Sequence, residues 1–139
     1  MRTMIDPKIW SDRDFDEITD GNVVYVYVYL MTNANMTSIG VYKLSKREAI
    51  HQLRISEEAF DKALNVLAKA LQNPKICYDE ATGWMWVRGS FARNYTSIPN
   101  ENLCKNVCKQ IEVLSSSDFP FFSDFYSKTK ALSKPFNHR

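Results

Sequence analysis

The clearest hydrophobic pattern in the chain lies between residues 56 and 72. Apolar residues recur there at spacings of three and four: Ala59, Phe60, Ala63, Leu64, Leu67 and Leu71. This spacing predicts a helix with one buried face. Ser56 is a suitable N-cap, and we expect the helix to end at Asn73, because the residue before a proline is disfavoured in helical backbone.

A shorter helix is predicted directly before it, over residues 46–53. Ser45 and Glu48 have the spacing of a capping box, in which the serine hydroxyl accepts a hydrogen bond from the backbone three residues on. Only Arg54 and Ile55 separate this helix from the next cap, so the connection is tight. The sequence therefore predicts two capped helices packed crosswise.

Three short strands are predicted around this helix pair. Residues 40–44 precede it, and residues 75–79 and 84–88 follow it with several β-branched and aromatic residues. Residues 80–83 end in a glycine and are typical of the turn of a β-hairpin. We expect the hairpin to lie beside the second helix.

The apolar run at residues 23–31 allows two interpretations. Its alternating Val and Tyr residues favour a strand. Asp20 is a good N-cap and residues 33–35 are a good stop, which favours a helix buried on all sides. Local sequence supports the two about equally.

The ends of the chain carry weaker patterns. In the acidic N-terminal segment 4–18, Ser11 or Asp12 can cap a short helical turn. Residues 99–114 predict a last helix, followed by a tail that is first Ser-rich, then aromatic, then basic.

We therefore divide the chain into a domain at 1–98 and a C-terminal helix and tail at 99–139, which packs on that domain or on a partner. The aromatic cluster at 119–125 is expected either to cover the core or to form a homodimer contact, because it is too large an apolar patch for a monomer to expose.

The predicted order of elements is that of a winged helix-turn-helix. The expected fold class is mainly α with a small β-hairpin, plus the C-terminal helix and tail. In such a fold the second helix of the pair can lie in the major groove of DNA, while the hairpin, or wing, reaches the backbone. Many domains of this shape bind proteins instead.

Composition narrows the function classes. The 139 residues suit one domain, and no apolar run reaches the roughly 20 residues of a membrane span. With three cysteines and no signal-peptide core, we expect a cytoplasmic protein without disulfides. We expect no metal at Cys104 and Cys108 with either His51 or His138, no cofactor and no enzymatic activity, since no catalytic group of residues is recognisable.

Charge gives only weak support for nucleic acid. The formal net charge is +2, with an excess of +3 over residues 39–75. Seven side chains are candidates for contacts with double-stranded DNA: Lys46, Arg47, Arg54, Lys62, Asn65, Lys69 and Arg88.

These candidates have different expected roles. The three around the first helix of the pair are expected to contact phosphates. On the second helix Asn65 can read adenine, and its two lysines can reach phosphate or guanine. Arg88 flanks the wing. Glu57, Glu58 and Asp61 at the start of the second helix oppose DNA binding, because carboxylates repel the phosphate backbone.

Six short motifs follow one another in the chain: residues 5–12 (IDPKIWSD), 29–33 (YLMTN), 39–45 (IGVYKLS), 53–56 (LRIS), 76–79 (ICYD) and 84–87 (WMWV). In this order they resemble motifs of the N-terminal domains of DnaD-like proteins and phage replisome organisers. The resemblance spans roughly residues 4–95. It implies a winged helix in which the run at 23–31 is a helix.

The resemblance also implies a role, without enzymatic activity, in initiating phage or plasmid-type replication. Our leading hypothesis is accordingly a winged-helix protein that binds double-stranded DNA. The alternative is a winged-helix interaction module that docks a replication protein through the aromatic tail or the acidic N-terminal segment. A transcriptional regulator of the same fold differs from the first only in the DNA site that it binds.

Overall fold

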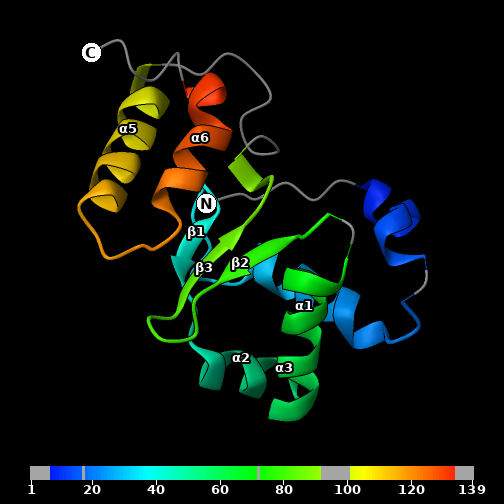
Figure 1. Ribbon diagram of the computed structural model, residues 1–139. Helices are drawn as coiled ribbons and strands as arrows, with labels where there is room; N and C mark the ends of the chain where they lie inside the picture. The colour runs from blue at the N-terminus through cyan, green and yellow to red at the C-terminus, as the bar shows by residue number, and fades with distance from the viewer. Residues whose placement is uncertain (1–6, 17, 72, 92–100, 134–139) are drawn as a thin grey trace.

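The computed structural model describes residues 7–16, 18–71, 73–91 and 101–133, apart from the side chains of Lys8, residues 101–104 and residues 129–133 (Figure 1). The elements are η1 Pro7–Ser11, η2 Arg13–Phe15, α1 Gly21–Thr32, β1 Val41–Lys43, α2 Lys46–Leu53, α3 Glu57–Asn65, η3 Val66–Ala70, β2 Ile76–Tyr78, β3 Trp84–Val87, α5 Glu101–Ser115 and α6 Phe122–Ser133. The described chain is mainly helical with one small antiparallel sheet, as the sequence predicts.

The sheet has three strands in the order β1-β3-β2. The predicted hairpin is present, with Ile76 opposite Val87, and β1 adds to it with Val41 opposite Trp86. Gly83 closes the hairpin turn at φ 83°, a left-handed conformation that glycine adopts without strain. The sheet thus joins two segments that lie on either side of the helix pair in the sequence.

Side chains alternate between the two faces of this sheet, and each face carries its own hydrophobic cluster. Tyr42 and Met85 belong to the cluster shared with α1, α2 and α3. Val41 and Trp86, their neighbours in sequence, belong to a second cluster with α5 and α6. Figure 1 shows α5 and α6 together on one side of the sheet and α1 to α3 on the other. The small sheet is therefore the middle layer of the molecule.

The run at 23–31 is helix, as the resemblance implies and against its strand propensity. Asp20 caps α1 by accepting a hydrogen bond from the backbone N–H of Asn22 at 3.0 Å. Val23, Val26 and Leu30 are fully buried in the first cluster. Burial of one helix face against α3 outweighs the modest helix propensity of valine and tyrosine, because propensity differences are below about 1 kcal/mol per residue.

The end of α1 is fastened to β1 by a short polar network. The hydroxyl of Tyr42 accepts a hydrogen bond from the Asn33 amide at 2.8 Å and donates one to the carbonyl of Leu30 at 2.8 Å. Burial raises the pKa of this tyrosine far above its ordinary value of 10.0. Two of the six motifs, at 29–33 and 39–45, therefore meet in the fold and have a structural task there.

The helix pair forms where its caps predict it. Ser45 accepts from the backbone N–H of Glu48, and Ser56 accepts from that of Ala59. Between them Arg54 has φ 58°, so a large side chain occupies a left-handed position. Glycine is the residue that such backbone favours at the end of a helix.

Two expectations for the helices need correction. The predicted helix over 56–72 is α-helical only to Asn65 and continues as the π-helical turn η3. Residues 122–133, which the sequence assigned to an aromatic and basic tail without a predicted helix, form helix α6. Phe119 and Phe125 are buried in the second cluster, so this aromatic segment covers the protein's own core; its use as a homodimer contact stays a prediction. None of the described helices combines the length and the apolarity that a membrane span requires.

Candidate functional site

The predicted DNA-binding face lies where α2, α3 and the hairpin turn meet, and a lysine lies at its centre. The ammonium of Lys46 is 2.6 Å from a carboxylate oxygen of Asp61, 3.9 Å from one of Glu57 and 3.7 Å from one of Glu80. Two of these acids come from the start of α3 and the third from the turn between β2 and β3. We call these four residues the Lys46 cluster.

The Lys46 cluster carries an excess of negative charge, since three carboxylates surround one ammonium. The hydrogen bond to Asp61 raises the pKa of Lys46, so the lysine is firmly charged. Its own side chain is 24 % exposed, whereas Glu57 is 69 % and Glu80 is 81 % exposed. A partner approaching this face therefore meets carboxylates before it meets the ammonium.

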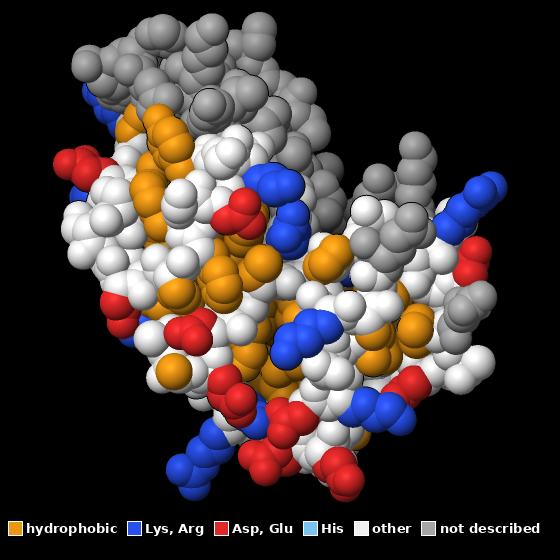
Figure 2. All heavy atoms as spheres, in the orientation of Figure 1, with side chains coloured by type: hydrophobic (Ala, Val, Ile, Leu, Met, Phe, Trp, Pro, Cys, Tyr) orange, Lys and Arg blue, Asp and Glu red, His pale blue; other side chains and the backbone are white. Residues whose placement is uncertain are grey.

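The residues around the Lys46 cluster do not cancel its net negative charge. Residues 46–70 and 79–83 together contain five basic and six acidic residues. Figure 2 shows acidic side chains gathered at the lower edge of the molecule, where α2 and α3 lie, with single basic side chains on either side. The basic excess of the central sequence is thus not one positive patch.

The other predicted contacts are exposed but scattered around the helix pair. Arg47 lies in the first turn of α2, and Arg54 is the left-handed residue after it. Lys62, Asn65 and Lys69 are exposed along one side of α3 and η3. Of the four cations in this set, none forms an ion pair with another described residue. They remain available to an anionic partner.

Arg88 has a structural environment. It directly follows β3, at the end of the hairpin remote from the turn, and its backbone N–H donates to the carbonyl of Lys75. Its guanidinium lies 5.1 Å from the ring centroid of Trp86 and donates weakly to the Cys77 sulfur at 3.8 Å. The packing of this side chain over the sheet therefore explains why an arginine occupies position 88.

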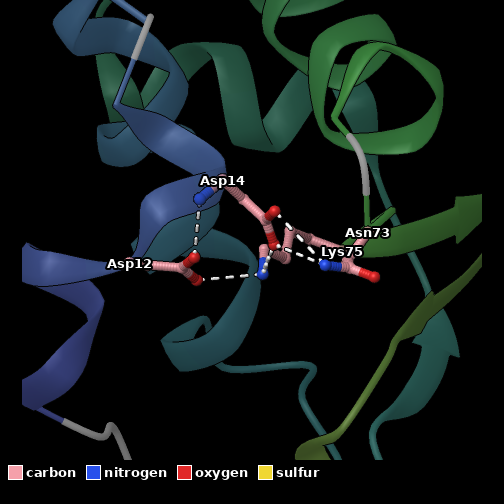
Figure 3. Close-up of polar contacts among 4 residues, drawn as sticks. All are labelled: Asp12, Asp14, Asn73 and Lys75. Atoms are coloured by element: carbon pink, nitrogen blue, oxygen red, sulfur yellow. Dashed lines mark hydrogen bonds and ion pairs between the residues drawn. The ribbon is translucent and has the colours of Figure 1, made fainter.

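A second lysine removes more of the predicted positive charge. Lys75 donates hydrogen bonds to Asp12 at 2.9 Å and to Asp14 at 2.8 Å, and Asn73 also donates to Asp14 (Figure 3). We call these four residues the Lys75 clamp. It ties the N-terminal segment to the loop that enters β2.

The Lys75 clamp shifts both kinds of ionisable group. The hydrogen bond from Lys75 holds the pKa of Asp14 below its ordinary 3.8. Burial alone would lower the pKa of Lys75, but its hydrogen bonds to Asp14 and Asp12 outweigh that effect and raise the pKa above 10.5.

The predicted cap is confirmed, since Asp12 also accepts from the backbone N–H of Asp14. No local spacing connects positions 12 and 14 to 75, so sequence reasoning missed the clamp.

A groove of about 540 Å³ opens between the edge strand β1 and α5. We call it the β1–α5 groove. Ile39, Val41, Trp84, Val113 and Leu114 line its apolar part, and the exposed Lys43 and Lys109 border it. Figure 2 shows hydrophobic side chains open to solvent along this part of the molecule. No local sequence pattern indicates this groove, because its two walls lie about 70 residues apart in the chain.

The residues considered for metal binding do not gather in the described part of the chain. His51 is exposed on α2, Cys108 is half-buried against the second cluster, and the side chain of Cys104 lies outside the described residues. No group of three metal-ligating side chains occurs among the residues that the structure describes.

Comparison of the chain with protein-family models, with curated proteins and with solved structures finds no match.

Proposed function

We propose that this chain is a winged-helix interaction module of phage or plasmid-type replication initiation, without enzymatic activity, that docks a replication protein. The succession α1-β1-α2-α3-β2-β3 with sheet order β1-β3-β2 supports a winged helix. The ordered motifs that resemble DnaD-like and replisome-organiser domains support the replication context. The motifs at 29–33 and 39–45 supply the polar network that fastens the end of α1 to β1.

The observation that carries the preference for a protein partner is the Lys46 cluster. In a winged helix that reads DNA, the start of the second helix and the wing approach the duplex together. Here these two places supply Glu57, Asp61 and Glu80, which repel phosphates and hold the nearest lysine for themselves. A protein surface with basic residues has no such conflict with this face.

Binding of double-stranded DNA is the second candidate, and four exposed cations favour it. Arg47, Arg54, Lys62 and Lys69 can each contact a phosphate without giving up an ion pair to a described residue. Together with Asn65 they define a backbone-binding mode that avoids the acidic start of α3. A transcriptional regulator would use the same residues.

A duplex titration distinguishes the two candidates. With fluorescent random-sequence duplex at low salt, we expect the wild-type chain to give no anisotropy change at micromolar protein. The triple variant Glu57→Gln, Asp61→Asn, Glu80→Gln is expected to bind, because it removes three repulsive charges and frees Lys46. Wild-type binding that is lost in Lys62→Ala, Lys69→Ala would overturn the proposal in favour of the DNA-binding candidate.

A further inference from the structure

The β1–α5 groove is held at a defined width by side-chain contacts across it. The amide nitrogen of Gln110 on α5 donates to the hydroxyl of Ser38, in the loop before β1, at 3.0 Å. At the other end, the indole N–H of Trp84 donates to Asp118, just after α5, at 2.7 Å. Because both ends of the groove are held by these contacts, the groove is already formed before a ligand binds.

The interior of the groove is apolar and is left uncovered by the described chain. Val113 is 64 % exposed although it faces the groove beside buried Leu114. Trp84 is half-buried, with its ring against Phe119 at a centroid distance of 5.4 Å. The groove is large enough for one aromatic or branched aliphatic side chain with its flanking backbone.

Thr37 rules out one common way of binding at the edge of a sheet. Its hydroxyl donates to the carbonyl of Val41 at 2.7 Å and accepts from the N–H of the same residue at 3.2 Å. These are outward backbone groups of β1, and a strand added along this edge would need them at Val41. Recognition in the groove must therefore use side chains rather than strand addition.

The charged residues at the border of the groove determine which charge a partner must carry to bind there. Lys43 and Lys109 both line it and are both exposed, and the ammonium of Lys43 lies 5.3 Å from the ring centroid of Trp84. Asp118 lies near Lys43 and accepts a hydrogen bond from the Trp84 indole, which lowers its pKa, so one charged carboxylate accompanies the two lysines and the net charge here is positive. Two cations next to an apolar opening complement an acidic ligand that carries an apolar anchor.

We propose that the β1–α5 groove binds an acidic peptide segment of a partner protein, with one aromatic or branched aliphatic residue inserted between β1 and α5 and flanking carboxylates on Lys43 and Lys109. The inference rests on the proposed docking function and adds a second contact surface, away from the Lys46 cluster, at which the partner presents an acidic segment.

The experiment uses the full chain and three labelled peptides: an Asp-rich peptide with a single Phe, the same peptide with Phe replaced by Ser, and a Lys-rich peptide with the Phe. Fluorescence anisotropy is expected to show saturable binding of the first alone. Val113→Asp is expected to weaken it about tenfold because it places a carboxylate in the apolar part of the groove, and Lys109→Glu by a similar factor because it reverses a charge at the border, about 1.4 kcal/mol in each case. Lys128→Glu, at an exposed lysine on α6 outside the groove lining, is the control with the same change of net charge as Lys109→Glu.

Several outcomes would overturn the inference. One is equal binding of the acidic and Lys-rich peptides, and another is an affinity that neither groove variant alters. A third is self-association of the chain, detected by light scattering, that Val113→Asp abolishes, because the occupant is then a second copy. Both groove positions are exposed, and circular dichroism checks that their variants fold.

The duplex titration separates this inference from the proposed function. Absence of peptide binding together with absence of duplex binding removes the groove ligand and leaves the docking function. Peptide binding in the groove together with duplex binding that depends on Lys62 and Lys69 removes protein docking as the main function and leaves the groove.

Discussion

The two sides of the sheet are stabilised differently. On the side of α1, α2 and α3 the core is mainly aliphatic, and the helices around it are fixed by serine and aspartate caps and by the Lys75 clamp. On the side of α5 and α6 the core is largely aromatic: the ring of Phe125 lies edge-on to those of Trp86, Phe91 and Phe119 at centroid distances of 5.6 to 6.4 Å.

This difference shows which part of the fold is determined by local sequence signals and which part by contacts between distant residues. Caps and helical spacing act within a few residues, so they define the first side in the sequence itself. Edge-to-face ring packing joins residues far apart in the chain and leaves no periodic pattern. The first side therefore contains most of the predicted elements, whereas the second side depends on contacts between residues far apart in the chain.

The largest expected effects come from removing one buried ring on each side. Phe60→Ala and Phe125→Ala each empty a fully buried site and are expected to lower the free energy of unfolding by about 3–5 kcal/mol. Because both clusters share the strands of one sheet, we expect each variant to unfold in a single transition. Urea denaturation followed by far-ultraviolet circular dichroism and by tryptophan fluorescence measures both quantities.

The exposed Val113→Ala on α5 is the control for these two variants, with an expected change within about 0.5 kcal/mol. If the two probes gave separate midpoints for Phe125→Ala, the α5–α6 side would be an independent unit and the shared-sheet argument would be wrong.

What the sequence could predict follows the same division. The two capped helices, the hairpin and the mainly helical class were available from spacing and turn chemistry. Helix α1 needed the resemblance, because propensity pointed to a strand. Helix α6 was not predicted, because Phe122, Phe125 and Tyr126 form only a short apolar stripe. The helix is buried against Trp86, which lies on β3 and is distant in the sequence.

The candidate site was predicted only in part, for an electrostatic reason. Charge counting over residues 39–75 treats every lysine as available. In the fold Lys46 is enclosed by three acids, Lys75 is bound to Asp12 and Asp14, and Lys43 lies on the other side of the sheet over Trp84. The partners of Lys75 lie 61 and 63 positions away in the chain. Glu57 and Asp61 lie in the same stretch as Lys46, but only the packing of α2 beside α3 brings them to it.

The next largest effect tests whether the Lys75 clamp secures the first side. Lys75→Met is expected to lower Tm by several degrees, since it leaves Asp12 and Asp14 facing each other without their cation. Lys69→Met, at an exposed lysine without an ion pair to a described residue, is the control and is expected to leave Tm nearly unchanged. Equal Tm values for the two variants would show that the clamp adds nothing to stability.

The pH dependence of the same pair sharpens this test. The pKa of Asp14 is lowered in the folded state, so its contribution to stability is present above its unfolded pKa of about 3.8 and is lost as the pH falls through the lowered value. We expect the Tm of the wild-type chain to fall in acid more steeply than that of Lys75→Met. Parallel Tm curves below about pH 5 would contradict the assignment.

A smaller effect, of opposite sign, is expected at the connection between α2 and α3. Arg54 holds a left-handed backbone that costs a non-glycine residue about 1–2 kcal/mol. Arg54→Gly is therefore expected to raise the free energy of unfolding by about 1 kcal/mol, after allowance for the greater flexibility of glycine when unfolded. Arg54→Ala keeps the strain and is expected to give no such gain, and an equal gain in both variants would exclude relief of strain as the cause.

The smallest effect on stability is expected at the Lys46 cluster, although this cluster decides the proposed function. Its carboxylates are half to four-fifths exposed, and ion pairs of that kind contribute below about 1 kcal/mol. Lys46→Gln should therefore leave the urea midpoint close to that of Lys62→Gln, its exposed control. A large loss of stability in Lys46→Gln alone would mean that the cluster is a structural fastening of the first side, comparable to the Lys75 clamp. Its acids would then be explained by folding, and their presence on this face would no longer favour a protein partner over DNA.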